Sequence, residues 1–486
     1  MALALAGLLV GFLGLRPGPA RLRPGVTDVV NADRPGINAH NSPAAAVDPV
    51  HPATIALADR IDTPRFSCSV SLSTTAGDSW RPLSMPLPPD APNCHQPDVA
   101  YDAAGRLLVL YTATGGRFNQ PVGIWLQRFD GEAPAGAAVH VGPAEAFHAH
   151  LTVDGERVWV SWVQVDGAAE LPLGFTATPG PVRLVRSDDG GGSFAAPVTV
   201  GEPGTRLVEP TPVALGGDRV VVGALDLGAD RLDYEAGHGG QGGPPSDDPW
   251  RVATWTSTDG GATFAPGVTV ASGLVAPQRI IVNLAPAPSF ARDPSRDGRL
   301  YATWDAGRGD GRDVFLARSD DGGATWSPAV DVAPRPRGQL LPAVGVSRSG
   351  RVDLVFYDRS ADPQDHLARV AMASSSDGGR TFRTATVSGP PFDTRIGFGS
   401  LQGIPVLGSR LAVLPEGGRS RAFWADTSRG TIDDNIADLA TVSVDMEAVG
   451  RRRPLLVAGG LLLLGLGGGL ALVVGFRPGD RRPQQA

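Results

Sequence analysis

Hydrophobic residues along this chain come in short runs that end at frequent turns. Arg106–Tyr111 reads Arg-Leu-Leu-Val-Leu-Tyr and Arg351–Tyr357 reads Arg-Val-Asp-Leu-Val-Phe-Tyr, and each follows another apolar run across a glycine-containing turn. Short apolar runs bounded by turn residues predict β-strands, and two in succession predict a hairpin. Such units begin near Pro43, Pro97, Ala149, Pro210, Pro288, Pro342 and Leu401. A unit of this length holds four antiparallel strands, so we expect an all-β propeller of seven four-stranded blades.

A second repeat, Ser-x-Asp-x-Gly-x-Thr/Ser-aromatic, recurs with the same period. Four copies fit fully, at 187–194, 257–264, 319–326 and 375–382, and another at 73–80 has Thr75 in the Asp position. An aspartate in a tight turn accepts hydrogen bonds from nearby backbone N–H groups, and glycine provides a left-handed position. The pattern predicts a fixed turn that buries its aromatic residue against the blade. A calcium or carbohydrate site in these turns is the less favoured alternative.

This repeat resembles the Asp box, or BNR repeat, of bacterial sialidases and related propellers, over roughly residues 40–445. Sialidases have six blades, so the resemblance implies six as the alternative to the seven units counted in the sequence. The seventh unit runs from Leu401 to Val444 and supplies three evident strands. We expect Val26–Val30 to add the fourth strand and close the ring.

The two ends of the chain carry targeting signals. Residues 1–20 form an apolar segment that ends in small residues, as a signal peptide does. Leu455–Phe476 contains no charged residue and is long enough to cross a bilayer as a helix. We expect a propeller over 26–446 outside the cytoplasm, a basic linker at 447–454, the single membrane helix at 455–476 and a short tail at 477–486. Arginines flank the span on both sides, so this orientation rests on the export signal.

Composition narrows the choice of partner and cofactor. Gly 64 and Pro 44 favour tight turns over long helices, and no lysine is present, so all 43 basic residues are arginine. A net charge of −7 without a basic, aromatic-rich patch argues against nucleic acid as a partner. Cys68 and Cys94 belong to no Cys/His array, so we expect no metal and no other cofactor. We favour one disulfide between them over two buried thiols.

Polar side chains are expected around one mouth of the central channel, where first strands begin and second strands end. The second strands end in Asp59-Arg60, Asp226, Asp305, Asp358-Arg359 and Asp426, and the first strands begin near Asn41, His95-Gln96, His148, His150, Glu209, Gln339 and Gln402. Each of these can simply terminate a strand. Their convergence predicts a ligand site made by Arg60, Asp226, Asp305, Asp358, Arg359, Asp426, His148 and Glu209. The loop Leu227–Trp250, with Tyr234, Glu235 and His238, is either a flap over this face or a disordered insertion.

The resemblance to sialidases does not extend to their chemistry. Sialidases use a tyrosine nucleophile activated by a glutamate, an aspartate acid/base and three arginines, the first in a Phe/Tyr-Arg-Ile-Pro motif. Asp59-Arg60-Ile61-Asp62 and Gln278-Arg279-Ile280-Ile281 come nearest, and both lack the proline. Asp59, Asp358, Tyr234 and Glu235 are the catalytic candidates. We favour a cell-surface module that binds a glycan or a cell-envelope protein over a divergent, exo-α-sialidase-like glycoside hydrolase; a purely structural membrane protein is the third possibility.

Overall fold

The computed structural model describes residues 20–31, 38–62, 67–115, 120–164, 181–202, 204–230, 250–274, 288–308, 311–336, 338–396 and 407–448. Every regular element in these ranges is a β-strand, and no helix among them is long and apolar enough to cross a membrane. The chain divides into two compact units, one of Leu22–Asp445 and one of Met1–Arg21 with Met446–Ala486. The predicted signal peptide, apart from Ala20, and the predicted membrane helix lie outside the described residues.

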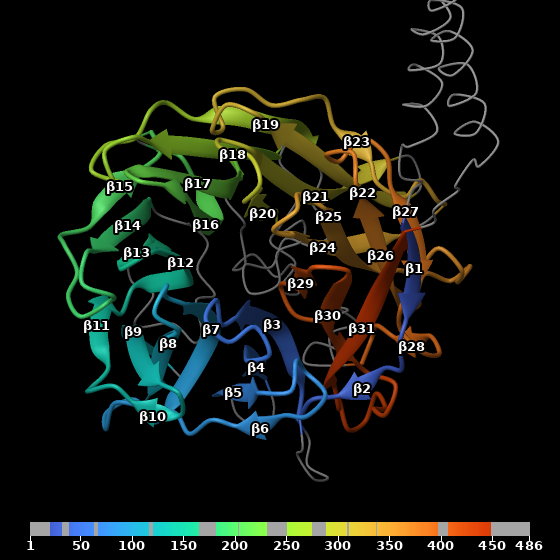
Figure 1. Cartoon of the computed structure of the whole chain (residues 1–486), viewed down its shortest axis with the longest axis horizontal. Helices are drawn as coiled ribbons and strands as arrows, with labels where there is room; N and C mark the ends of the chain where they lie inside the picture. The colour runs from blue at the N-terminus through green and yellow to red at the C-terminus, as the bar shows by residue number, and fades with distance from the viewer. Residues whose placement is uncertain are drawn as a thin grey trace, which may run out of the picture. The chain divides into compact units, whose positions relative to one another are not determined.

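The unit Leu22–Asp445 is a propeller, and Figure 1 shows its sheets arranged around a ring. Blade 1 comprises β3 (His40–Val47), β4 (Ile55–Ile61), β5 (Ser67–Ser73) and β6 (Arg81–Pro82). Blade 2 comprises β7 (Asn93–Tyr101), β8 (Leu107–Gly115), β9 (Gln120–Asp130), β10 (Ala133–Pro134) and β11 (Val139–Gly142). Blade 3 comprises β12 (Ala146–Asp154), β13 (Arg157–Gln164), β14 (Val182–Ser187) and β15 (Val198–Val200). Blade 4 comprises β16 (Leu207–Gly216), β17 (Arg219–Asp226), β18 (Trp250–Ser257) and β19 (Val268–Leu274).

Three further blades complete the ring. Blade 5 comprises β20 (Ser289–Arg292), β21 (Leu300–Arg308), β22 (Gly311–Ser319) and β23 (Val330–Asp331). Blade 6 comprises β24 (Gln339–Val346), β25 (Val352–Asp358), β26 (Leu367–Ser375), β27 (Arg383–Thr386) and β28 (Phe392–Asp393). Blade 7 comprises β29 (Ala412–Glu416), β30 (Arg419–Asp426) and β31 (Asp438–Ala448), with β1 (Ala20–Pro24) and β2 (Asp28–Val29). The prediction of seven antiparallel blades is confirmed, and the six-bladed alternative is wrong.

The N-terminal segment closes the ring, partly through the predicted stretch Val26–Val30, which contains β2, and partly through β1, which lies before that stretch and also pairs with β31. Asp28 and Val29 pair antiparallel with Thr441 and Ala440 of β31. The backbone N–H of Val30 extends this ladder by donating to the Leu439 carbonyl over 2.8 Å. The outer strand of blade 7 therefore comes from the opposite end of the propeller sequence.

The start of the seventh unit differs from the sequence alignment. The alignment placed it at Leu401, which lies outside the described residues. In blade 7, Ala412 pairs with Phe423, as Ala343 pairs with Val355 in blade 6. The position matching Pro342 is therefore Leu411, ten residues later than expected. Leu411 carries no proline to mark it, and this is why the alignment missed it.

The Ser-x-Asp-x-Gly repeats, here called boxes, form the expected turns. In the box of blade 3, Asp189 Oδ1 accepts hydrogen bonds from the Ser187 hydroxyl over 2.7 Å and from the Ser193 N–H over 2.9 Å, and Gly191 has a φ of 80°. These bonds lower the pKa of Asp189 to about 2, with the Ser187 hydroxyl as the main cause. In the box at 73–80, Thr75 replaces the carboxylate with a single hydroxyl, which accepts the Ser79 N–H over 2.9 Å.

Each box also fastens its blade to the preceding one. The Trp159 indole donates to the Gly260 carbonyl over 2.9 Å, and the Arg318 guanidinium donates to the Gly378 carbonyl over 2.9 Å. At the closure of the ring, Trp80 packs edge-on against Phe423 of blade 7, with ring centroids 5.8 Å apart. The hydrophobic clusters likewise combine adjacent blades, so the core lies between blades.

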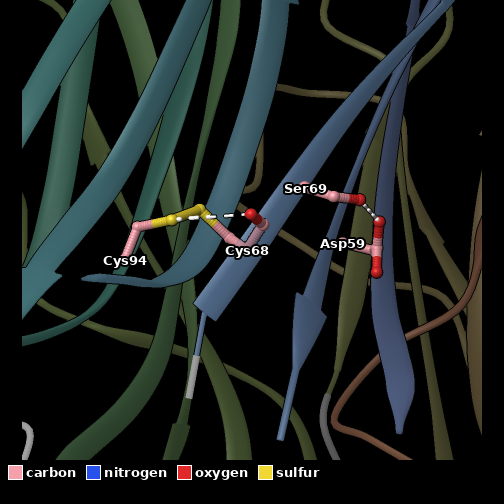
Figure 2. Close-up of a disulfide and its surroundings, with 4 residues drawn as sticks. All are labelled: Asp59, Cys68, Ser69 and Cys94. Carbon is pink, nitrogen blue, oxygen red and sulfur yellow. Dashed lines mark hydrogen bonds between the residues drawn. A yellow bond between two sulfur atoms is a disulfide. The ribbon is translucent and has the colours of Figure 1, made fainter. Parts of the chain in front are cut away.

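A disulfide joins the first two blades. Figure 2 shows Cys68 of β5 and Cys94 of β7 bonded between neighbouring sheets. Their Cα atoms are 5.3 Å apart, within the range that a disulfide spans. Cys94 is buried in the cluster shared by blades 1 and 2, so the bond links two sheets that already pack together.

Candidate binding site on the propeller axis

One cavity is lined by a side chain from the first strand of every blade. These residues share one register position, since Asp98, His150 and Thr211 lie opposite equivalent points of their second strands, at Leu110, Ser161 and Gly223. The set, here called the axial ring, is Ala44, Asp98, His150, Thr211, Ser289, Ala343 and Ala412. The cavity has a volume of about 260 Å³. Because all seven first strands reach it, the cavity lies on the propeller axis.

In the first strands of blades 1, 2, 3, 4 and 6, a second ring of residues precedes the axial ring, at a β-bulge. The register shifts there, and the bulged residue takes a left-handed φ between 46° and 53°. These residues, here called the bulge ring, are Ser42, Gln96, His148, Glu209 and Leu341. None is a glycine, so each position carries backbone strain of about 1 kcal/mol or more. Arg410 occupies the matching position of blade 7.

Neighbouring bulges are bonded to one another around the axis. The Gln96 side-chain carbonyl accepts the His148 N–H over 3.1 Å, and His148 Nδ1 lies 2.9 Å from Glu209 Oε1. On the other side of the ring, the Ser42 hydroxyl accepts the Ser409 N–H over 2.9 Å. The bulges therefore turn polar groups toward adjacent blades, and these contacts hold the strained backbone in place.

His150 links the two rings. Its Nδ1 lies 3.2 Å from Asp98 Oδ2 and its Nε2 lies 3.3 Å from Glu209 Oε2. Asp98 Oδ2 also accepts the Leu151 N–H over 3.2 Å. The imidazole thus lies between two carboxylates, one from blade 2 and one from blade 4, at the wall of the cavity.

The surroundings shift the pKa of each of these groups toward its charged form. Burial acts to raise the pKa of Glu209, but the charges and hydrogen bonds of His148 and His150 hold it well below its usual value. Burial likewise opposes ionisation of Asp98, and the His150 hydrogen bond and the Arg410 charge outweigh it and lower its pKa. Burial acts to lower the pKa of His150, but its bonds to both carboxylates raise it. The site is a compact set of compensated charges.

Arg410 crosses the channel mouth from blade 7 to blades 1 and 2. Its Nε donates to the Ser42 carbonyl over 3.2 Å and its Nη2 donates to the Pro97 carbonyl. Its Nη1 lies 3.3 Å from His150 Nδ1. The guanidinium therefore ties three blades to the network around His150.

Only part of the predicted mouth site comes together here. His148 and Glu209 contact each other, and Arg60 and His148 both lie close enough to the buried His95 to lower its pKa, after burial as the main cause. Arg60 is itself fully buried, and its Nε pairs with Asp62 Oδ1 over 2.7 Å. Asp59 contacts His40 over 2.6 Å and, as Figure 2 shows, the Ser69 hydroxyl.

Three of the predicted aspartates share one structural role. Asp226, Asp358 and Asp426 each accept the backbone N–H two residues later, from Gly228, Ser360 and Ser428 over 2.8–2.9 Å. The second oxygen of Asp226 pairs with Arg251 over 2.7 Å, and that of Asp358 pairs with Arg335 over 2.8 Å. These contacts cap the turn after the second strand, and none of the three lines the axial cavity.

Asp305 and Arg359 do not line the axial cavity, but Asp305 Oδ1 accepts the N–H of Leu341 in the bulge ring over 3.3 Å. Asp305 pairs with Arg312 over 2.6 Å, and Arg359 pairs with Asp365 over 3.1 Å. Burial lowers the pKa of Arg359, and Asp305 and Arg312 are among the charges that act on it. The candidates Tyr234 and Glu235, with His238 and Gln402, lie outside the described residues.

Four residues that line the cavity were not predicted from the sequence as site residues: Asp98, Thr211, Ser289 and Arg410. Asp98, Thr211 and Ser289 each follow the proline that marks the start of a unit, namely Pro97, Pro210 and Pro288. The residue after each of these prolines could therefore have been predicted to line the channel. Arg410 had no such signal, because the start of blade 7 was misplaced.

Comparisons with known proteins identify the fold and leave the family open. No family model matches the sequence, and no curated protein matches it. Among solved structures, an ulvan lyase of a polysaccharide lyase family, bound to -[GlcA(1-4)Rha3S]-, is 13% identical, with 87% of this chain and 96% of that chain covered and a TM-score of 0.50.

Two further structures are similar at lower scores. An α-L-arabinofuranosidase from Fusarium graminearum is 12% identical over 87% of this chain and 98% of that chain, with a TM-score of 0.44. A Trypanosoma rangeli sialidase is 10% identical over 94% of this chain and 62% of that chain, with a TM-score of 0.45. At such low identity, what this chain shares with the ulvan lyase is the fold alone.

Proposed function

We propose that this protein is a carbohydrate-binding propeller, anchored at the cell surface by its C-terminal apolar segment. The observation that carries the proposal is the two-sided wall of the axial cavity. Within the axial ring, blades 2 to 5 contribute polar groups, from Asp98, His150, Thr211 and Ser289, whereas blades 1, 6 and 7 contribute the methyl groups of Ala44, Ala343 and Ala412. Arg410 of blade 7 also lines the cavity, next to these methyl groups. A sugar ring has hydroxyl groups at its edge and C–H groups on its faces, so it complements both sides.

The size of the cavity suits a small ligand. Its volume of about 260 Å³ is just below the range of about 300–1,000 Å³ typical of small-molecule pockets. One sugar residue at the end of a chain is therefore the ligand we expect. The solved structures with similar folds include enzymes that act on polysaccharides or glycosides, which supports a carbohydrate as the ligand class.

Binding fits the electrostatics better than glycoside hydrolysis does. A hydrolase acting through Asp98 and Glu209 needs one of them protonated to act as the acid. The pKa of each is lowered, so both are ionised at neutral pH. Both nitrogens of His150 already face a carboxylate, which leaves no free position on the imidazole for a substrate proton. A divergent hydrolase is the alternative, and release of sugar from glycosides by the purified protein would favour it.

The Thr211 hydroxyl provides the test of the site. Thr211→Val keeps the shape of the side chain but removes a hydroxyl that lines the cavity, so we expect sugar binding to weaken about three- to tenfold. Thr269→Val, on the exposed outer strand of the same blade, is the matched control and should bind as the unaltered protein does. Binding is measured by calorimetric titration of the full chain with a panel of monosaccharides and short oligosaccharides. Equal binding by both variants would place the site elsewhere.

The position of the propeller relative to the membrane is tested in a separate experiment. We propose that the propeller faces the exterior and that residues 455–476 anchor it, as their apolar sequence indicates. Protease added to intact cells should then remove the propeller, whereas protection from protease would contradict this orientation.

A further inference from the structure

The charges at the axial cavity compensate one another, and this bears on the kind of sugar that fits there. Asp98 and Glu209 are ionised, and His150 lies between them. Arg410 contacts His150, and its charge acts on Asp98. In the described part of the chain, Arg410 is the one arginine that lines the cavity. The positive charge of Arg410 at the cavity wall is therefore already offset by a neighbouring carboxylate.

The hydrogen bonds that Arg410 already makes also disfavour its use by an anionic ligand. Its Nε and Nη2 donate to the Ser42 and Pro97 carbonyls, and its charge acts on Asp98. A ligand carboxylate seeks two parallel N–H groups of a guanidinium. The edge of the guanidinium formed by Nε and Nη2 is already used by these carbonyls, so a carboxylate could take this edge only if Arg410 gave up both hydrogen bonds.

The groups at the cavity that can still form hydrogen bonds with a ligand are a neutral hydroxyl donor and a carboxylate acceptor. The Ser289 hydroxyl accepts the Val344 N–H over 3.2 Å, so its own proton is available to a ligand. The carboxylate of Glu209 faces His148 and His150 and still has lone pairs that can accept a sugar hydroxyl. A ligand carboxylate would instead face Asp98 and Glu209 across the same small cavity.

We infer that the axial cavity selects an uncharged sugar and discriminates against the same sugar carrying a carboxylate or sulfate, because its two carboxylates are already matched by Arg410 and His150. This inference rests on the proposed function and narrows the ligand class. The discrimination comes from like charges brought together in a confined, partly desolvated site, where repulsion is costly.

The inference is tested with pairs of sugars in which one member is neutral and the other carries a carboxylate. The full-length protein is titrated with glucose and glucuronate, and with galactose and galacturonate, at low and at moderate salt. We expect the neutral member of at least one pair to bind about tenfold or more tightly than its acid, and its affinity to be the less affected by salt. An acid that binds as tightly as its neutral partner overturns this inference and leaves the proposed function standing. Failure of every member of the wider sugar panel overturns both.

A variant that lacks one carboxylate tests whether the charges at the cavity cause the preference for a neutral sugar. Asp98→Asn removes one of the compensated negative charges, so the Arg410 charge becomes available, and the preference for the neutral sugar should shrink by about tenfold. Asp90→Asn makes the same change at an exposed residue outside the cavity wall and should leave the preference unaltered. Circular dichroism and melting curves establish that both variants fold. An unchanged preference in a folded Asp98→Asn variant would show that the charge network does not select the ligand.

Discussion

Substitution of tyrosine by phenylalanine should change the stability of the protein by different amounts at two buried positions. Tyr357 of β25 and Tyr111 of β8 are both fully buried in the second strands of their blades. The Tyr357 hydroxyl donates to the Ala425 carbonyl over 3.1 Å and accepts the Ala425 N–H over 3.0 Å. The Tyr111 hydroxyl is buried without a hydrogen-bond partner among the described residues.

The Tyr357 hydroxyl completes a sheet. The ladder between β29 and β30 ends at Ala412 opposite Phe423, two residues short of Ala425. The hydroxyl from blade 6 satisfies the backbone groups that β29 does not reach, and Ala425 is itself fully buried. Tyr357→Phe would leave a buried donor and a buried acceptor unpaired, which costs about 2–3 kcal/mol of unfolding free energy.

Tyr111→Phe should behave differently, because it removes a hydroxyl that is already unpaired. We expect a change of less than about 0.5 kcal/mol, or a slight gain in stability. Urea unfolding of both variants, monitored by tryptophan fluorescence, measures the two free energies under one condition. Equal losses in the two variants, or a larger loss for Tyr111→Phe, would refute the assignment of these hydrogen bonds.

Three further predictions concern stability. Replacing Cys68 and Cys94 by alanine should lower the unfolding free energy by about 3.5 kcal/mol, the loop-entropy value for a separation of 26 residues; an oxidised and a reduced sample of the natural protein that unfold alike would contradict it. Deleting residues 26–31 should lower the melting temperature by several degrees, whereas Val26→Ala, at a 90% exposed position, should not. The pKa of Glu209 is lowered on folding, so its contribution is present above about pH 4.5 and lost as the pH falls through the folded pKa. Glu209→Gln should therefore flatten the acid side of a stability–pH curve measured by urea unfolding, and an unchanged curve would contradict this.

The fold could be predicted from the sequence because the turns that define it depend on local interactions. In the box of blade 3, Asp189 bonds to Ser187 and Ser193, which lie two and four positions away. The ring closure by Val26–Val30 was also predicted, because blade 7 supplied only three strands. Composition and periodicity thus determine the number of blades and the way the ring ends.

The candidate site depends on contacts between distant positions. His150 faces Asp98 and Arg410, which lie 52 and 260 positions away in the sequence. Only the register of the first strands brings them together, and a bulge shifts that register in the strands that carry Asp98 and His150. The predicted aspartates at strand ends, such as Asp358, bond instead to their own turns, a local role that the sequence pattern does not distinguish from ligand binding.

The pairing of Asp28 with Thr441 has a consequence for how the protein is made. β1 and β2 leave the ribosome before all other strands and their partner β31 leaves last, so these early strands stay unpaired while nearly the whole propeller is synthesised. Contacts of such long sequence separation slow folding, and unpaired strand edges invite association with other chains. Chains that stop before residue 438 would lack the partner for β2 and should accumulate as aggregates or be degraded.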